Sequence, residues 1–213
     1  MTADRPARGL AVLGTLRRRI VLNELAPGAL LTELALAVDL GCSQAAVREA
    51  LLRLDGEGLV CRAGRAGTTV TDLDAATAGE ILDLRRRMEL RAARHAVRRA
   101  TGGDVARLAS LQEAMDRAAE TGDAWALIER DTEFHLALYR IGGVPALAPI
   151  LARCIMHTHR FKLWAPWHRR PLAVTAARHR PILAAVRAGN GAGLVRALGD
   201  HLDSIVERKE AVA

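Results

Sequence analysis

Two short helical segments joined by a glycine-containing turn place the strongest constraint on the fold. Thr32 can cap the first segment, and Glu33 lies in its first turn, where a carboxylate complements the helix dipole. Gly41 ends this segment, and Ser43 can cap the next one. The second segment carries an apolar stripe at helical spacing, formed by Val47, Ala50, Leu51 and Leu54, and is broken by Gly56 and Gly58. The pattern predicts a helix-turn-helix, whose second helix enters the DNA major groove by its N-terminal residues.

The flanking segments extend this unit to a winged helix. Residues 10–25 carry Leu and Ile at helical spacing, and the Ala-Pro-Gly at 26–28 ends that helix. Within the first short helix, we expect four side chains to face inward in part: Leu34, Leu36, Val38 and Leu40. After the second helix, LVCRAGRAGTTVT (59–71) alternates as two strands around a turn, with Arg62 and Arg65 near its tip. These elements predict a winged helix-turn-helix DNA-binding domain over residues 1–73.

The rest of the chain has no strand pattern. Ala/Leu/Arg-rich segments are separated by short glycine-containing stretches that are typical of helix ends. Six helices are predicted, at about 76–100, 103–121, 123–140, 144–163, 172–188 and 191–210. Short loops make successive helices antiparallel. The predicted fold is therefore mainly α, with an all-α antiparallel bundle over residues 74–213.

Charge alone does not identify the partner. The chain has 31 Lys+Arg and 24 Asp+Glu, a formal net charge of +7. Residues 1–75 contain nine of each sign, so the surplus lies in residues 76–213, with 22 basic against 15 acidic residues. The predicted DNA-binding part thus carries almost no net charge, and what matters there is whether cations gather on one face.

Composition also excludes some classes of protein. We find no uninterrupted apolar run long enough to span a membrane and no signal peptide, so we expect a cytoplasmic protein without membrane contact. The cysteines are Cys42, Cys61 and Cys154; their odd number and wide spacing indicate neither a disulfide framework nor a zinc cluster. We expect reduced thiols in packed positions.

Histidine and aspartate residues of the predicted bundle form a candidate metal site. Asp131 and His135 are four positions apart, which places both on one face of a helix. His179 and His201 lie on two later helices, and helices of a bundle converge on its interior. Three imidazoles and one carboxylate suit a divalent transition metal, and octahedral geometry would leave two open positions. We expect zinc, with nickel and manganese as alternatives.

One of these ligands has an alternative. Pro181 follows His179 by two positions, so His179 lies at or just before a helix start, unless the helix begins earlier and kinks. His157 is the substitute ligand. It shares a helix face with Arg153 and Arg160, and this face could also line a ligand pocket.

The N-terminal residues resemble a known family. PGALLTELALAVDLGCSQAAVREALLRLDGEGLVCRAGRAGTTV (27–70) is similar to the DNA-binding domain of the GntR family of bacterial transcription regulators. The resemblance implies that DNA is contacted by Ser43, Gln44, Ala45 and Arg48 of the second helix and by Arg65 and Gly67 of the wing. The family often has Arg where this chain has Leu34 and Gln44, although the Gln44 amide can read adenine.

The resemblance extends into the helical part. LRRRMEL (84–90), ERDTEFHLALY (129–139), RHRPILAAVRAGN (178–190) and HL (201–202) resemble motifs of the effector-binding (FCD) domain in the FadR-type branch of this family, although Val144 replaces the usual Asn after the Gly pair. The resemblance implies that Asp131, His135, His179 and His201 hold a metal ion and that a small carboxylate effector completes its coordination. Arg85, Arg160 and His157 are candidate effector contacts. For Arg85, a salt bridge with Glu89 is an equal alternative.

These observations predict a homodimeric repressor that binds an inverted-repeat DNA operator and responds to a carboxylate metabolite. A metal-dependent hydrolase with a DNA-binding-like domain is the alternative from another class, since a metal with open positions can activate water. A third possibility is a dimerisation scaffold with inert histidines. Glu133, between the first two ligands, would point away from the metal and offers the hydrolase no partner.

Overall fold

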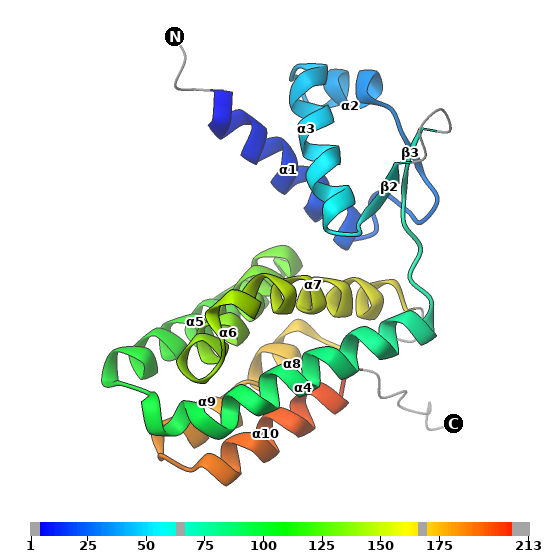
Figure 1. The fold of residues 1–213 in the computed structure, drawn as a ribbon. Coiled ribbons are helices and arrows are strands. Elements are labelled where there is room, and N and C mark those ends of the chain that lie inside the picture. The colour runs from blue at the N-terminus through cyan, green and yellow to red at the C-terminus, as the bar shows by residue number, and fades with distance from the viewer. Residues whose placement is uncertain (1–4, 63–66, 166–169, 206–213) are drawn as a thin grey trace, which may run out of the picture. The chain divides into compact units, whose positions relative to one another are not determined.

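The computed structural model describes residues 5–62, 67–165 and 170–205, and the side chains of residues 5–8 are not described (Figure 1). Contacts divide the chain into two compact units, Met1–Asp74 and Ala75–Ala213.

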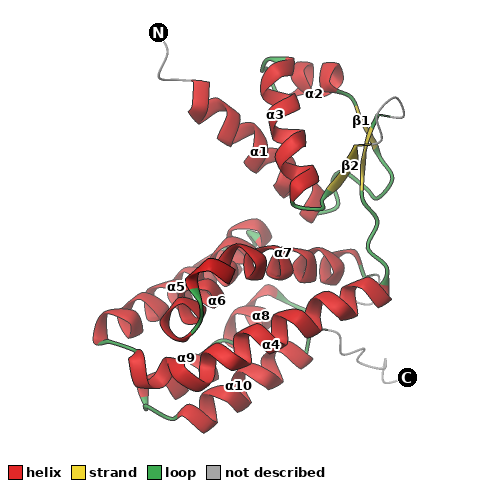
Figure 2. Cartoon of the chain, viewed as in Figure 1, coloured by secondary structure: helices red, strands yellow, loops and turns green. Residues whose placement is uncertain are grey.

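The first unit is a winged helix-turn-helix, as predicted. It contains α1 (Arg5–Val21), α2 (Glu33–Asp39) and α3 (Gln44–Gly56), with the strands β1 (Leu30–Leu31), β2 (Val60–Arg62) and β3 (Thr68–Val70) (Figure 2). The sheet order is β1-β3-β2 and both pairings are antiparallel, with Val60 opposite Val70. The hairpin of β2 and β3 confirms the predicted wing. The β1 strand was not predicted, because two residues are too few to show an alternating pattern.

Side-chain caps define the helix-turn-helix. The Thr32 hydroxyl accepts a hydrogen bond from the Ala35 amide, and the Ser43 hydroxyl accepts one from Ala46 at the start of α3. Gly41 adopts φ +59°, a left-handed conformation that glycine tolerates well, and this reverses the chain between the helices. The predicted caps and turn are therefore present.

The core of the first unit lies between α1 and α3, where Leu16, Ile20, Leu51 and Leu54 are fully buried. The expectation that Leu34 and Val38 face inward is wrong: their exposures are 62% and 77%. In the seven-residue helix α2 these two residues share one face, and the buried residue Leu36 lies on the opposite face.

The cysteines differ in burial. Cys61 is exposed, because strand residues alternate and its neighbour Val60 takes the core position, whereas Cys154 is buried.

The second unit consists of helices joined by short loops, with no strand among its described residues. Its helices are α4 (Ala75–Arg99), α5 (Gly102–Glu120), α6 (Ala124–Gly142), the short 3-10 helix η2 (Pro145–Leu147), α7 (Ala148–Trp164), α8 (Leu172–Ala177), α9 (Arg180–Arg187) and α10 (Gly191–Asp203). The single helix predicted at 172–188 is two helices, α8 and α9. Pro181 lacks an N–H and its ring would clash with the Ala177 carbonyl in a continuous helix, so the helix breaks before it.

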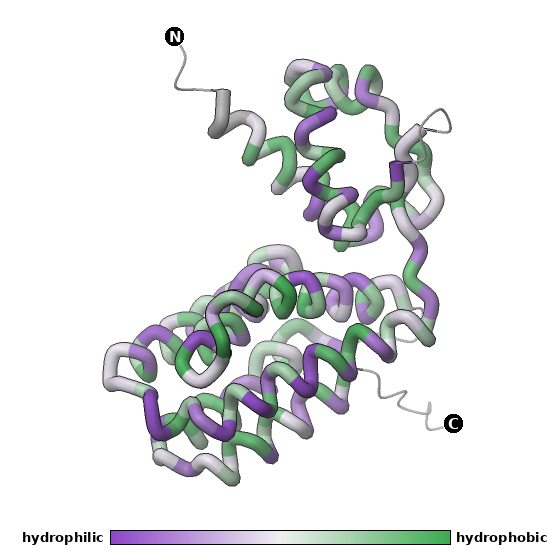
Figure 3. Tube along the Cα trace, in the orientation of Figure 1, coloured by the Kyte–Doolittle hydropathy of each residue, from purple (hydrophilic) through white to green (hydrophobic). Residues whose placement is uncertain are grey.

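Apolar residues alternate with polar ones along these helices (Figure 3), and the apolar faces meet around Phe134, Leu108, Met115 and Leu198. α4 packs against α6, α7 and α10. The α4–α6 crossing is close, because a Cβ added at Gly142 would lie 2.1 Å from the Ala92 carbonyl oxygen. No helix in the described ranges combines the length and the apolar character needed to cross a bilayer.

Candidate metal centre and DNA-reading surface

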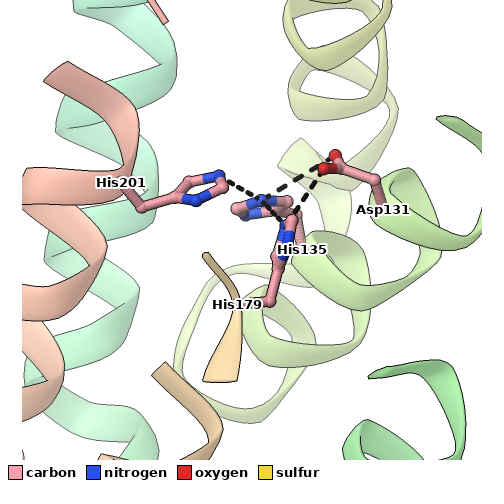
Figure 4. Close-up of side chains that lie close together, drawn as sticks. All are labelled: Asp131, His135, His179 and His201. Atoms are coloured by element: carbon pink, nitrogen blue, oxygen red, sulfur yellow. Dashed lines mark hydrogen bonds and ion pairs between the residues drawn. The ribbon is translucent and has the colours of Figure 1, made fainter. Parts of the chain in front are cut away.

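Four polar side chains from distant parts of the chain converge inside the second unit (Figure 4). Asp131 and His135 project from α6, His179 lies at the junction of α8 and α9, and His201 projects from α10. All four are buried, and one potential ligand atom from each lies within 4.8 Å of the others. The structure thus brings together the set that the sequence predicted.

The distances within this cluster suit a bound cation. The Nε2 atom of His135 lies 3.1 Å from Nε2 of His201 and 3.3 Å from Nε2 of His179. Nε2 of His179 is 3.0 Å from the Asp131 Oδ1 atom. Ligand atoms each about 2.1 Å from one ion, and at right angles to each other, lie about 3.0 Å apart. The four donors are therefore compatible with one metal ion.

A buried ionic chain supports His135 from behind. Its Nδ1 donates to Glu89 Oε2 at 2.6 Å, and the other Glu89 oxygen accepts from Arg85 Nε at 2.6 Å. Burial would raise the pKa of Glu89, but the charges and hydrogen bonds of His135 and Arg85 lower it to about 2. The ionised carboxylate holds the proton on Nδ1 and leaves Nε2 free to bind a metal.

Asp131 is held by two histidines. His159 Nε2 lies 2.8 Å from its Oδ2 atom, and His179 approaches the other oxygen. Burial would raise the pKa of Asp131, but His159 and His179 hold it well below its usual value. The pKa of His201 is lowered well below its usual value by burial and by the charges of His179 and His135. A carboxylate and a neutral imidazole are the protonation states that metals require.

The helix break places His179 at the site. The residue stands immediately before α9 without capping it through its side chain. This side chain is fully buried, and its Nδ1 donates to the Ala176 carbonyl at 3.3 Å, which leaves Nε2 facing the cluster. His157, the alternative ligand, is not part of this cluster.

A narrow cavity adjoins the cluster, with free space for about one water molecule. Asp131 and His201 form part of its wall, together with four cationic side chains: Arg85, Lys162, Arg170 and Arg178. Burial lowers the pKa of Lys162 to about 8. Arg85 donates from Nη1 to Thr158, while its buried Nη2 has no hydrogen-bond partner among the described residues. The cavity is strongly electropositive.

The predicted effector contacts fare differently. Arg85 pairs with Glu89, so the predicted salt bridge is present, and it also lines the cavity; its contact with an effector stays a prediction. His157 and Arg160 do not line it, and the Arg160 guanidinium lies over the Trp164 ring at 4.2 Å. On α7 the cavity face carries Thr158, His159 and Lys162, and the two predicted residues lie on other faces of that helix.

Several functional candidates were not predicted from the sequence: Glu89 as a partner of His135, and His159, Lys162, Arg170 and Arg178 in the cavity wall. The spacing of His159 and Lys162 on one helix face was the only available signal. Arg170 and Arg178 stand at helix ends, where no periodic pattern indicates which way a side chain points.

The first unit presents the predicted DNA contacts at the start of α3. Ser43, Gln44, Ala45 and Arg48 are exposed there. The Arg48 guanidinium is paired with Glu33, with Nη2 2.6 Å from Oε2. Gly67 follows the wing tip with φ +87°, and Arg65 lies outside the described residues.

Comparisons with known proteins agree with both units. Residues 9–70 match the family described as bacterial regulatory proteins, gntR family, and residues 80–204 match the FCD domain. The HTH-type transcriptional regulator McbR of Escherichia coli is 34% identical over 142 residues, which cover 67% of this chain and 64% of McbR, so the matched part spans less than two thirds of that relative. The Nta operon transcriptional regulator of Aminobacter aminovorans is 31% identical over 85% of this chain and 86% of that protein.

A solved structure is similar over almost the whole chain. The structure of E. coli McbR/YncC superposes with a TM-score of 0.76 at 28% sequence identity, covering 92% of this chain and 94% of that one.

Proposed function

Because the chain belongs to the GntR family of bacterial regulatory proteins and carries an FCD domain, we propose that it is a homodimeric repressor whose operator binding is controlled by a small carboxylate bound at a metal ion. The relatives are transcriptional regulators and not enzymes, which removes the hydrolase alternative.

The DNA-reading part rests on the exposed start of α3. Ser43, Gln44, Ala45 and Arg48 would contact DNA from the recognition helix, and Arg65 and Gly67 from the wing. A recognition helix inserts its N-terminal residues into the major groove, and the Gln44 amide offers the donor and acceptor pair that matches adenine. A dimer would place two such helices on an inverted repeat.

The metal-binding part rests on the donor set. Asp131, His135, His179 and His201 would hold one divalent ion, and imidazole-rich sites suit zinc and nickel, with manganese favoured by added oxygen ligands. When bound, the ion supplies positive charge and free coordination positions for a carboxylate oxygen. The alternative of inert histidines leaves unexplained why the Nε2 atoms of His135 and His179 lie 3.3 Å apart, since both rings donate from Nδ1 and neither Nε2 then carries a proton to share.

We expect the effector to be an anion, because the charged side chains around the cavity are mostly cationic. Four cations line the cavity beside the cluster, and Asp131 is the sole acidic residue in its described wall. The unpartnered Arg85 Nη2 is a ready donor to a carboxylate. Because the free space is small, a ligand must displace side chains such as Lys162 or Arg178 to enter, which gives ligand binding a way to alter the packing of α7 and α8.

The observation that carries the proposal is the convergence of the four donors beside this cationic cavity. The test is chelator-free purification with metal analysis, followed by DNA binding titrated with small mono-, di- and tricarboxylates, in wild type and in His135→Ala. An effect of a carboxylate that requires the metal supports the proposal. A carboxylate that acts equally well on the metal-free variant contradicts it. A promoter-reporter assay tests repression.

A further inference from the structure

Glu33 lies beside the proposed DNA contact Arg48, at a place where a carboxylate would repel phosphates. It stands in the first turn of α2, and its two oxygens accept hydrogen bonds from Arg48 of α3. The Nε atom of Arg48 is 2.9 Å from both oxygens, and Nη2 is 2.6 Å from Oε2. Two nitrogens on one edge of the guanidinium thus hold one carboxylate, which is the geometry of a bidentate ion pair.

The pair leaves the other edge of Arg48 facing outward. The Arg48 side chain is 58% exposed, against 23% for Glu33. Arg48 Nη1 has no hydrogen-bond partner among the residues that the structure describes. Since the guanidinium is planar, fixing one edge fixes the direction in which Nη1 points. Glu33 therefore restricts a long side chain that would otherwise sample many rotamers.

A second cation faces the same carboxylate. Arg62, at the end of β2 where the wing begins, places Nη2 4.0 Å from Glu33 Oε1. Glu33 thus pairs with Arg48 of the recognition helix and faces Arg62 of the wing, and its negative charge offsets one of these two positive charges. The hydrogen bond from Arg48 is the main reason that the pKa of Glu33 is lowered, so the carboxylate stays anionic at neutral pH.

We propose that Glu33 is a specificity-determining residue: it orients Arg48 for one DNA contact and cancels charge that would otherwise bind any duplex. The inference rests on the proposed contact between Arg48 and DNA. Phosphate neutralisation supplies most of the binding to non-specific DNA, whereas discrimination needs a fixed donor at a base edge. Removing the carboxylate adds attraction to every duplex and frees Arg48 to rotate, so non-specific binding gains and specific binding loses its advantage.

The test compares two duplexes of equal length and base composition. One is selected from a random library by the wild-type protein, and the other is its scrambled version. In Glu33→Gln we expect binding of the scrambled duplex to tighten about 3- to 10-fold at low salt, and its salt dependence to steepen by about one unit of log-log slope. The affinity ratio between the two duplexes should fall.

Two variants separate orientation from charge. Glu49→Gln makes the same charge change on α3, but Glu49 pairs with Arg53 and not with Arg48. Arg48→Lys keeps the charge and loses the planar fork, so it should lower the affinity ratio without changing the salt slope. Arg48→Lys also keeps the inference testable if Glu33→Gln weakens folding, which thermal unfolding will report.

The outcomes are distinct. Equal effects of Glu33→Gln and Glu49→Gln on both duplexes would mean that only overall charge matters, and would overturn the inference. Loss of binding in Arg48→Ala with an unchanged affinity ratio in Glu33→Gln would overturn it while leaving the proposed Arg48 contact intact. No effect of Arg48→Ala would remove that contact, and the role of Glu33 with it.

Discussion

Replacing Glu89 with glutamine should weaken metal binding without touching a ligand. Glu89 is 2% exposed and lies between His135 Nδ1 and Arg85 Nε, each at 2.6 Å. Glutamine can still accept one hydrogen bond, but it lacks the charge that makes His135 a stronger donor to a metal. Loss of such a supporting carboxylate costs about 10- to 100-fold in metal affinity. This corresponds to about 1.4–2.7 kcal/mol of binding free energy.

The same substitution should lower stability, because it removes the carboxylate charge that pairs with the buried Arg85 guanidinium and leaves it with uncharged partners such as Thr158. Removing one member of a buried ion pair costs about 3–5 kcal/mol, and the retained hydrogen bonds should place this variant at the lower end. Thermal unfolding of the metal-free protein measures this loss separately from metal affinity.

The assay for metal affinity is competition with a chromophoric chelator of known affinity at fixed pH. Glu133→Gln is a matched control: it lies between Asp131 and His135 in the sequence, but its side chain is 45% exposed and pairs with Arg130. We expect the control to bind metal like the wild type. Wild-type affinity in Glu89→Gln, or an equal loss in Glu133→Gln, would refute the supporting role of Glu89.

Four further predictions follow from the structure. Arg48→Ala should weaken binding to a selected operator by about 1–3 kcal/mol at fixed salt, measured by fluorescence anisotropy, and an unchanged affinity would exclude Arg48 as a base contact. His201→Ala should lose the ion that we expect in the wild-type protein, and equal metal content in both proteins would exclude the site. The metal content of the wild type should also fall as pH drops, because protons compete for the ligand nitrogens. The pKa of Glu89 is lowered to about 2, so ionised Glu89 should contribute about 3 kcal/mol to the free energy of unfolding of the metal-free protein. This contribution should be complete above pH 4.5 and be lost as pH falls toward 2. Identical acid unfolding of the wild type and Glu89→Gln would contradict this. Gly142→Ala should destabilise the folded protein by about 1–3 kcal/mol, because the added Cβ would clash with the Ala92 carbonyl. Gly79→Ala should not destabilise it, because the space around Gly79 is open. Urea unfolding of both variants checks the difference.

Local patterns were enough to predict the elements of the first unit. Caps and glycines act within a few residues, so Thr32, Gly41 and Ser43 indicate where helices begin and end without knowledge of distant contacts. Which face of a short helix is buried is a different matter. Leu34 and Leu36 are equally apolar, and only the packing of α2 on α3 decides that Leu36 is buried and Leu34 exposed.

The sequence by itself also predicted the four residues of the metal cluster, through the spacing of Asp131 and His135 and the resemblance of the later motifs. Only the tertiary structure decided how they meet: Pro181 breaks the helix so that His179 turns inward, and the bundle packs α10 against α4, which brings His201 to His135. It likewise decided that Glu89 supports His135 and that Arg170 and Arg178 join Arg85 in the cavity, while Arg160 lies over Trp164. Sequence spacing fixes neighbours along one helix, because the helical repeat is regular. Contacts between helices depend on how whole faces pack, and no local pattern carries that information.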